Sequence, residues 1–542
     1  MANPGVLFVT MQPKPGLPLE QFHEWYNNEH GPTRLRLPQI FQNGLRYRAA
    51  DGKKPEYLAV YNVTSMPLME TPIYKSLREN RSAHEAETIA QVEVERHFWD
   101  LQSTNQSQSF IPSAHLTDDE AERIALLTVE LKLKNVANAE AKVAKWYDDH
   151  VNMLSRVTGW LRSRILKTSS LEIGAPTSFI VLHEFAKENR LGDVANNIAE
   201  STPGWSEVQN YATLSTQRVY SLFYVFGPAP RDLENLAKLG NSASSFKPAD
   251  PTSLSLTGNA VIDFHVASYD RLDIPYRLEG NPDPKAPTIA FCNSLLTSLD
   301  MWEPFVEILK KQRPQYRILR YDARGRHAVP SPATPATLDM LSDDLLSLLG
   351  ALRIPKLNTL IGVSMGGATT LKFALEHPDR LSRFIACDFN VASSAANTSA
   401  WKERIALAET PVVDGKPGIQ KLAGQTVERW FHPSTMQKKV GVARWMTDMV
   451  AANDVEGFKY SCQALWDYDM KEKMKDEMSD CRLQRLLVVG EGDGKGALVK
   501  AMEGFKDQLG KGGSKLAVVP EAGHLPMCEN PEGFWKAVEG FL

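Results

Sequence analysis

One short stretch, G-V-S-M-G at 362–366, constrains the fold of this 542-residue chain more than any other feature. An apolar run over 357–361 precedes it, and an apolar, helix-like segment over 368–376 follows it. Glycine at both ends allows a tight, strained turn that a Cβ atom would obstruct. In this strand–turn–helix context the pattern predicts that Ser364 is a nucleophile held above the end of a strand. The alternative is an ordinary strand-to-helix turn without chemistry.

A serine hydroxyl needs a base to take its proton, and the base needs an acid to orient it. His524 lies in A-G-H-L-P just after one apolar run, and Asp493 follows another. The order serine, acid, histidine is the one expected with this turn, so we predict a Ser364–His524–Asp493 triad. Glu491 and Asp388 compete for the acid role, since Asp388 also ends a predicted strand. A structural histidine and a turn aspartate are the ordinary alternatives.

Attack by serine creates an oxyanion, which fixed N–H donors must stabilise. One expected donor is the backbone N–H of Met365, the residue after the nucleophile. The second is expected from the loop after the predicted strand 289–292, at the N–H of Leu295, with Ser294 as the alternative. Asn293 would brace this loop, or would simply form a turn.

From residue 259 onward, apolar strand-like runs alternate with helix-like segments. This alternation predicts a mostly parallel sheet with helices on both faces. Between 391 and 479 it gives way to amphipathic, aromatic-rich stretches, which predicts a helical cap. A segment rich in Ser, Pro, Asn and Gly over 231–257 predicts a linker. The strand candidates are 289–292, 316–321, 359–363, 384–388, 486–489 and 516–519, and the helix candidates include 338–352 and 368–377.

The first 230 residues contain a weak internal repeat. One copy has E-W-Y-N-N-E-H at 24–30, and the other has K-W-Y-D-D-H at 145–150; each is followed by a glycine and an arginine-bearing strand. Both copies have the element order β-α-β-β-α-β of a ferredoxin-like module. The predicted strands are 6–11, 45–49, 57–63 and 92–99 in one copy, and 124–133, 161–167, 178–185 and 218–226 in the other.

These motifs resemble the EthD-type dimeric α/β-barrel family, with its W-Y…H helix and later G-x-R-Y-like strand. The resemblance implies modules at 1–110 and 111–230 that pack sheet to sheet, as a pseudo-dimer within one chain. It makes His30 and His150, at matched positions, candidate acids or bases; packing or a helix-end role is the alternative. It also leaves open a decarboxylase or cyclase activity, or a binding module that sets a homo-oligomeric state.

A second and more specific resemblance covers about 259–542. This part is similar to an α/β-hydrolase, nearest to the 3-oxoadipate enol-lactonase family, which implies a hydrolase domain over 258–542 that opens an enol-lactone. Leu296 and Ser298 stand where that family has Gly and Asp, so the pocket wall is expected to differ. The segments that carry the resemblance are the serine turn, C-N-S-L at 292–295, R-Y-D-A-R-G at 320–325, G-H-L-P at 523–526 and three stretches of the predicted cap, at 401–405, 427–431 and 460–465.

A few residues are weaker candidates for substrate binding. Arg324 would grip a substrate carboxylate with two N–H groups, or it would pair with a neighbour such as Asp322. Trp430 in the cap would line a pocket, although aromatic residues at helical spacing more often lie in a core. Asn293 and Ser294 complete this predicted set.

Composition excludes several classes of function. With 61 basic and 65 acidic residues the net charge is −4, which gives no electrostatic footprint for nucleic acid. No His/Cys/Asp cluster has metal-ligand spacing and no glycine loop suits a nucleotide, so we expect neither a metal nor a cofactor. The first ten residues do not resemble a signal peptide, no apolar run would span a membrane, and the five cysteines form no C-x-x-C pair. We therefore expect a cytoplasmic protein that acts on a small molecule.

The residues predict hydrolysis of a lactone or ester of a small acid, and the resemblance implies that this acid is aromatic-derived. Cleavage of a carbon–carbon bond beside a ketone is the closest alternative, because the same triad can perform it. The predicted fold is an α/β-hydrolase with a helical cap, preceded by α+β tandem ferredoxin-like repeats.

Overall fold

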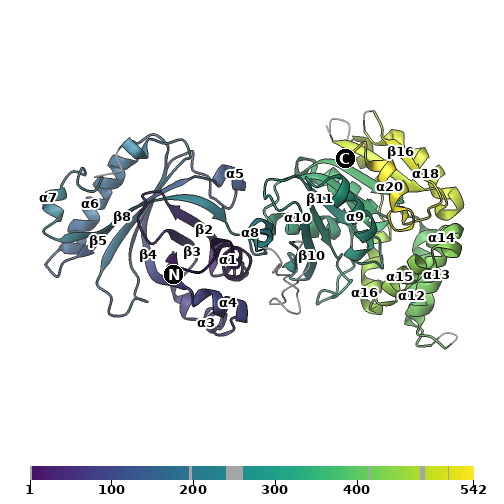
Figure 1. The fold of residues 1–542 in the computed structure, drawn as a ribbon, viewed down its shortest axis with the longest axis horizontal. Helices are drawn as coiled ribbons and strands as arrows, with labels where there is room; N and C mark the ends of the chain where they lie inside the picture. The colour runs from purple at the N-terminus through teal and green to yellow at the C-terminus, as the bar shows by residue number, and fades with distance from the viewer. Residues whose placement is uncertain (1–2, 194–197, 240–259, 413–414, 477–482, 511) are drawn as a thin grey trace. The chain divides into compact units, whose positions relative to one another are not determined.

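The computed structural model describes residues 3–193, 198–239, 260–412, 415–476, 483–510 and 512–542. The chain divides into two compact units, one through Pro230 and one from Arg231 onward. Figure 1 colours the first unit from purple to blue and the second from teal to yellow. Both predicted repeats lie in the first unit, called the barrel unit below, and the serine turn and the cap lie in the second.

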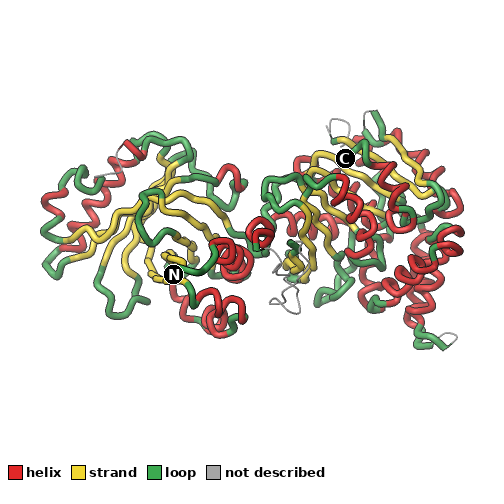
Figure 2. The backbone as a smooth tube through the Cα atoms, viewed as in Figure 1, coloured by secondary structure: helices red, strands yellow, loops and turns green. Residues whose placement is uncertain are grey.

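The barrel unit is a closed barrel of eight antiparallel strands in the order β1-β3-β2-β8-β5-β7-β6-β4 (Figure 1; Figure 2). Each repeat contributes four strands, and each set of four has the strand order of a ferredoxin-like sheet. The predicted α+β class of this half is therefore confirmed. The strands are β1 (Gly5–Pro13), β2 (Phe41–Ala49), β3 (Tyr57–Val63), β4 (Val92–Gln106), β5 (Ala125–Leu133), β6 (Trp160–Thr168), β7 (Ser178–Phe185) and β8 (Ala212–Val225).

The two repeats meet at two seams, where β2 pairs with β8 and β4 pairs with β6. At the second seam β4 continues past its predicted end at Trp99, and its extension to Gln106 lies along β6. The two sheets thus join edge to edge rather than face to face. An unpaired strand edge leaves backbone N–H and C=O groups without partners, and closing the barrel removes every edge.

Strand β1 shows how the barrel separates two layers of core. Leu7 and Val9 pack with Phe22 of helix α1 on one side of the sheet. Val6 and Phe8, which alternate with them, pack in the barrel interior with strands from both repeats. The α-helices of this unit within the described residues are α1 (Leu19–Trp25), α2 (Gly31–Leu35), α3 (Pro72–Glu79), α4 (Ala83–Ile89), α5 (Asp118–Ala121), α6 (Ala139–Leu154) and α7 (Trp205–Val208).

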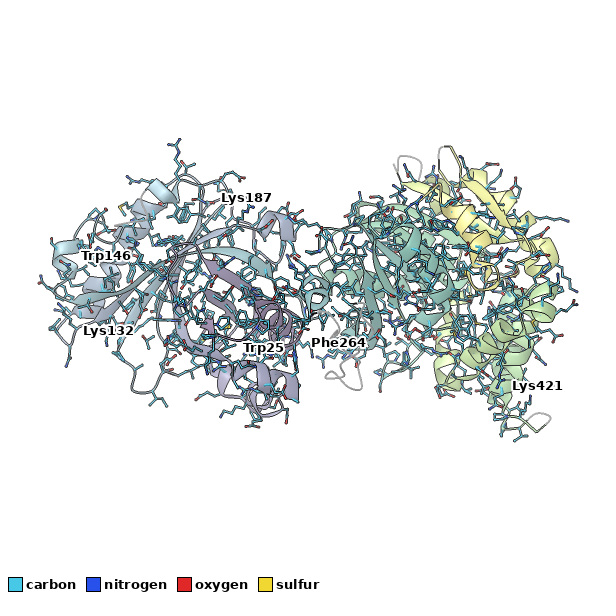
Figure 3. All side chains as sticks on the ribbon, viewed as in Figure 1. Trp25, Lys132, Trp146, Lys187, Phe264 and Lys421 are labelled. Carbon is cyan, nitrogen blue, oxygen red and sulfur yellow. The ribbon has the colours of Figure 1, made fainter. Side chains whose placement is uncertain are left out.

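The helices that carry the repeated W-Y…H motif differ by one residue. His30 is five positions after Trp25, whereas His150 is four positions after Trp146. The extra residue is absorbed by a π-helical turn, η1 (Tyr26–His30), between α1 and α2, while α6 is a regular helix. The Trp and His ring centroids are 4.8 Å apart in both copies, so the pairing survives the insertion. Figure 3 labels both tryptophans.

The second unit is built on an eight-stranded sheet in the order β16-β15-β14-β13-β11-β12-β10-β9. Strands β11 to β16 pair in parallel, as predicted, whereas β9 and β10 form an antiparallel edge. The predicted α/β class is confirmed. The strands are β9 (Ile262–Ala267), β10 (Asp273–Gly280), β11 (Thr288–Cys292), β12 (Arg317–Tyr321), β13 (Leu357–Val363), β14 (Leu381–Cys387), β15 (Gln484–Gly490) and β16 (Lys515–Val519).

A group of helices between β14 and β15 forms the cap (Figure 1). Helix α8 (Leu233–Lys238) lies in the segment predicted as a linker, of which 240–257 lie outside the described residues. Within the described ranges no helix has the length and apolar character needed to cross a membrane. The cap helices are α12 (Ala395–Glu409), α13 (Gly418–Trp430), α14 (Pro433–Lys438), α15 (Val440–Ala451), α16 (Val455–Cys462) and α17 (Lys471–Asp476). The others include α9 (Glu303–Gln312), α10 (Leu338–Ala351), α11 (Met365–Glu376), α18 (Ala497–Phe505), α19 (Pro526–Glu529) and α20 (Pro531–Val538).

Candidate active site

The G-V-S-M-G stretch forms a sharp turn. Strand β13 ends at Val363 and helix α11 begins at Met365, so Ser364 alone makes the turn. Ser364 has φ 58° and ψ −118°, a strained conformation for a residue with a Cβ atom. A Cβ atom at Gly366 would overlap the backbone oxygen of Cys292, so glycine lets the start of α11 approach the loop after β11. The turn therefore holds Ser364 at the end of the strand, against that loop.

His524 and Asp493 form a hydrogen-bonded pair. Asp493 begins a 3-10 turn, η8 (Asp493–Gly496), just after β15, and His524 lies between β16 and α19. The His524 Nδ1 and Asp493 Oδ2 atoms are 2.7 Å apart, and the two side chains are 15% and 10% exposed. Because an ionised carboxylate only accepts hydrogen bonds, Nδ1 carries the proton and Nε2 keeps a lone pair. The imidazole is thus held in the tautomer that a general base needs.

The register of the sheet brings Ser364 to the same edge. Strands β13, β14 and β15 are neighbours; Val363 lies opposite Cys387, and Cys387 lies opposite Val488. The N–H of Ser364 donates to the carbonyl of Cys387 over 2.9 Å. The carboxyl ends of parallel strands form the edge where ligands bind in α/β sheets. The three residues of the predicted triad follow β13, β15 and β16 at this edge.

The cap contributes Trp430 to the surroundings of His524. The Trp430 ring stacks on the imidazole with 5.5 Å between centroids and 29° between planes. Its carbonyl accepts the backbone N–H of His524 over 2.7 Å. Trp430, expected as a pocket wall, is buried in the structure and fixes the position and tilt of the imidazole.

Asp388, the competing acid, lies beside the His524–Asp493 pair. It follows β14, is 1% exposed, and accepts the N–H of Gly490 at Oδ1 over 2.8 Å. Its Oδ2 is buried and makes no hydrogen bond of standard geometry with the described residues. Burial and the neighbouring Asp493 carboxylate raise the pKa of Asp388 well above its ordinary value, so this site favours the protonated form of Asp388. Asp493 is the acid that bonds to the imidazole.

The other competing acid, Glu491, accepts the backbone N–H of Glu521 over 3.1 Å.

Asp388, Asp493 and His524 each offer one potential ligand atom, and these atoms lie within 4.8 Å of one another, a spacing that a metal ion could bridge. The His524–Asp493 hydrogen bond already joins two of them, and a backbone N–H occupies one oxygen of the third. The cluster has the arrangement of a hydrogen-bonded acid–base network.

Side-chain hydrogen bonds fix the loop after β11. Asn293 accepts the indole N–H of Trp302 over 2.9 Å and donates to the carbonyl of Tyr321 over 2.8 Å. The two ends of the Asn293 amide therefore tie this loop to Trp302 and to the end of β12. Leu296 has φ 68°, and its carbonyl accepts the amide N–H of Asn453 over 2.8 Å. No sequence motif points to Asn453, because it reaches the loop from the cap, far along the chain.

The predicted oxyanion donors lie on two segments that touch. Leu295 belongs to the braced loop and Met365 begins α11, and both are buried. A Cβ atom at Gly366 would lie 2.6 Å from the oxygen of Asn293, which shows how closely the two segments approach. The first N–H groups of a helix have no partner within it, so the N–H of Met365 is suited to an oxyanion. Ser294, the alternative donor, is buried in the same loop.

Arg324 lies in a buried ion-pair network. Its side chain is 0% exposed and pairs with Asp344 over 2.6 Å and with Asp270 over 3.0 Å. It also donates to the hydroxyl of Tyr460 in the cap over 2.8 Å. The guanidinium thus joins Tyr460 of the cap to helix α10 and to the turn between β9 and β10. Neither of these carboxylate partners is Asp322, the neighbour suggested by the sequence.

The two matched histidines lie in the barrel unit and have different partners. His150 Nδ1 is 2.6 Å from Thr202 Oγ1, and burial lowers the pKa of His150 to about 3. His30 Nδ1 is 2.8 Å from Glu85 Oε1. One copy therefore pairs its histidine with a hydroxyl and the other with a carboxylate.

Comparison with known proteins identifies the second unit. The sequence model of the alpha/beta hydrolase fold family matches residues 287–531, and the barrel unit lies outside this match. 3-Oxoadipate enol-lactonase 1 of Acinetobacter baylyi is 31% identical over 262 residues, which are 48% of this chain and 91% of that protein. Enol-lactonase 2 of the same organism is 27% identical over 256 residues, 47% and 88% of the two chains. A crystal structure of the enol-lactonase from Burkholderia xenovorans covers 51% of this chain and 99% of its own at 29% identity, with a TM-score of 0.44. The C-terminal half of this chain belongs to the α/β hydrolase family.

Proposed function

We propose that the second unit is a serine hydrolase that opens a lactone or ester of a small acid, with Ser364, His524 and Asp493 as its triad. The observation that carries the proposal is the His524–Asp493 hydrogen bond at the sheet edge where the strained Ser364 turn also ends. Two relatives that share this half at 27% and 31% identity are named enol-lactonases, which supports ester or lactone chemistry.

In the proposed reaction, His524 Nε2 takes the proton of Ser364 as the hydroxyl oxygen attacks the carbonyl carbon. Asp493 orients the imidazole and stabilises its charged form. The N–H groups of Met365 and Leu295 hold the oxyanion of the tetrahedral intermediate. The leaving oxygen then takes the proton from the imidazole, which next activates a water molecule to release the acid from the serine.

The leaving group and the pocket wall set the expected substrate. An enol oxygen leaves more readily than an ordinary alkoxide because it is less basic, so an enol-lactone suits this triad. Leu296 adds a buried side chain beside the oxyanion loop, where the enol-lactonase pattern has glycine. We therefore expect the reaction class to match that of enol-lactonases while the acyl part of the substrate differs.

The test is hydrolysis of an enol-lactone and a panel of small esters by the full chain, with Ser364→Ala and a matched control, Ser215→Ala. Ser215 is exposed on β8 of the barrel unit, so its replacement should leave turnover unchanged. We expect Ser364→Ala to lower kcat by at least about 10³-fold with an unchanged circular dichroism spectrum. A folded Ser364→Ala that keeps the wild-type rate would refute the triad. Serine-dependent cleavage of a carbon–carbon bond, with no ester hydrolysed, would keep the triad and refute the substrate class.

We also propose that the barrel unit consists of two EthD-like modules. The repeated Trp–His pair and the closure of two ferredoxin-like sheets into one barrel support this proposal. If the modules carry a decarboxylase or cyclase activity, Ser364→Ala will retain it and His30→Asn will remove it. If they assemble chains, the full-length protein will sediment as an oligomer. If the full-length protein is a monomer and all of its activity requires Ser364, ligand binding is the remaining role for the barrel unit.

A further inference from the structure

The barrel unit has a small pocket between the helix that ends in His30, helices α3 and α4, and strand β4. Its polar lining includes His30, Arg34, Tyr74, Arg81, Glu85 and Arg96. The pocket has room for a small functional group rather than for a whole large molecule.

The charges that line this pocket do not balance. The guanidinium groups of Arg34 and Arg81 line the pocket together with one carboxylate, that of Glu85, whose Oε1 is 3.8 Å from Arg81 Nε. Burial and the nearby Arg34 lower the pKa of His30 to about 3, so the imidazole is neutral at pH 7. A pocket with more fixed positive than negative charge attracts an anion.

Arg34 shows this imbalance most clearly. It is 7% exposed, donates one N–H to the carbonyl of His30 over 2.8 Å, and packs over the Tyr61 ring at 5.3 Å from its centroid. Its Nε is buried and has no hydrogen-bond partner among the described residues. A buried charge is stable only when a counter-charge and hydrogen bonds satisfy it. Glu85 already supplies a counter-charge to Arg34, and a bound anion would accept the hydrogen bond that Nε lacks.

The His30–Glu85 pair limits which anion fits. Burial alone would raise the pKa of Glu85, but the hydrogen bond from His30 and the Arg34 and Arg81 charges hold it below its ordinary value. Glu85 is therefore ionised, His30 Nδ1 donates to it over 2.8 Å, and Nε2 keeps a lone pair. A fixed negative charge and a neutral acceptor disfavour a dianion such as phosphate. A monoanion is the better match.

The matched histidine of the second repeat has a different partner. There the matched histidine, His150, bonds to the hydroxyl of Thr202 instead of a carboxylate. The first repeat also has the π-helical turn Tyr26–His30, and such turns occur frequently at functional sites. The charged pocket and the π-helical turn are thus found together in one copy of a duplicated module.

We propose that this pocket binds the carboxylate group of a small organic acid. Arg34 and Arg81 donate to the carboxylate, since the forked N–H groups of arginine match its two oxygens. The ring of Tyr74 and the side chain of Leu77, which also lines the pocket, face the apolar body of the acid. The site is independent of the Ser364 triad.

The experiment is calorimetric titration of benzoate into the full chain and into three charge variants. Arg81→Gln removes a guanidinium whose side chain is 29% exposed, so the core is spared, and should weaken binding about tenfold. Glu85→Gln keeps the hydrogen bond from His30 but removes the opposing charge, and should tighten binding about threefold. Arg48→Gln, at a side chain that is 62% exposed and outside the pocket, is the matched control and should bind like wild type.

Opposite shifts for Arg81→Gln and Glu85→Gln would support the site, because a merely structural role would weaken binding in both. The absence of saturable binding in the wild-type protein would overturn the proposal. Equal affinities for wild type and Arg81→Gln, or an equal loss in Arg48→Gln, would also overturn it. Phosphate binding more tightly than benzoate would refute the assignment to a carboxylate. Benzoate binding that persists in Ser364→Ala would separate this site from the proposed hydrolase site, and its loss there would place benzoate at the triad and overturn the proposal.

Discussion

The backbone N–H of Gly490 donates to Asp388 Oδ1 over 2.8 Å and fixes one oxygen of a carboxyl group whose other oxygen is enclosed beside Asp493. Asparagine matches the protonated form that burial of Asp388 favours, because its oxygen accepts and its nitrogen donates. It also tolerates the left-handed φ of 46° at this position. We expect Asp388→Asn to keep kcat/KM within about threefold, and Asp388→Ala to lower it about tenfold. Ester hydrolysis by both variants measures this, and equal losses would contradict it.

Asp388 should make the stability of the fold depend on pH. Burial raises its folded-state pKa above the unfolded value, so folding favours the protonated form. Its contribution is therefore fully favourable below the unfolded pKa of about 4, and declines as the pH rises toward the folded-state pKa. Asparagine does not titrate, so Asp388→Asn should flatten this decline. Thermal unfolding of both proteins between about pH 4 and about pH 8 measures the difference; parallel declines would show that the pKa of Asp388 is not raised on folding.

Replacing Asp493 should remove catalysis while keeping the fold. In Asp493→Asn the amide can donate to His524 Nδ1, which moves the imidazole proton to Nε2 and removes the base. We expect kcat to fall by roughly 10⁴-fold, as in other triads with this change. Asp448→Asn, at a side chain that is 74% exposed, is the control and should keep full activity. Steady-state ester hydrolysis measures both; a fall of less than about tenfold would assign the acid role elsewhere.

Two glycines that lie in helices should respond oppositely to alanine. A Cβ atom at Gly366 would overlap the oxygen of Cys292, so Gly366→Ala should destabilise the protein by about 2 kcal/mol and displace the oxyanion loop. Gly424 lies in α13 with nothing within 4 Å of the added atom, so Gly424→Ala should stabilise it by about 0.5–1 kcal/mol. Urea unfolding measures both. A neutral Gly366→Ala would show that the loop moves freely.

The buried network around Arg324 should contribute to stability rather than to substrate affinity. Arg324→Met leaves Asp344 buried and unpaired, and should destabilise the protein by about 3–5 kcal/mol. Arg444, whose side chain is 84% exposed and 4.0 Å from Asp448, is the control; Arg444→Met should change stability by less than about 1 kcal/mol. Unfolding at fixed pH measures this. A stable Arg324→Met with a raised KM would instead return Arg324 to substrate binding.

Most strands of the second unit could be predicted because each is a short, continuous apolar run, such as 359–363 within β13. Strands β9 and β10 were not predicted. Buried and partly exposed residues alternate along both strands; β9 is the edge of the sheet, and β10, which pairs with β9 and β12, contains Pro275 and Arg277. Proline and charge within a strand weaken the apolar signal by which a strand is recognised. The extension of β4 past Trp99 was missed for a similar reason, since its polar residues are ordered by pairing with β6.

The candidate site also contains residues that a local sequence pattern predicts and contacts that no such pattern predicts. Ser364 and His524 have local signals, because each lies in a glycine-containing turn after an apolar strand. The partners of Arg324 and the contact of Asn453 with Leu296 join segments that are far apart in the sequence. No spacing in the chain encodes such contacts. The sequence shows the extra residue before His30, but only the structure shows that a π-helical turn absorbs it.

The two seams of the barrel join strands that come from different repeats. A barrel made from two identical chains would have to carry every substitution twice, on both sides of its axis. Linking the copies in one polypeptide removes that symmetry. His30 can keep a carboxylate partner while His150 has a hydroxyl, and one helix can gain a residue that the other lacks. Duplication therefore allows one half of the scaffold to specialise while the other half maintains its shape.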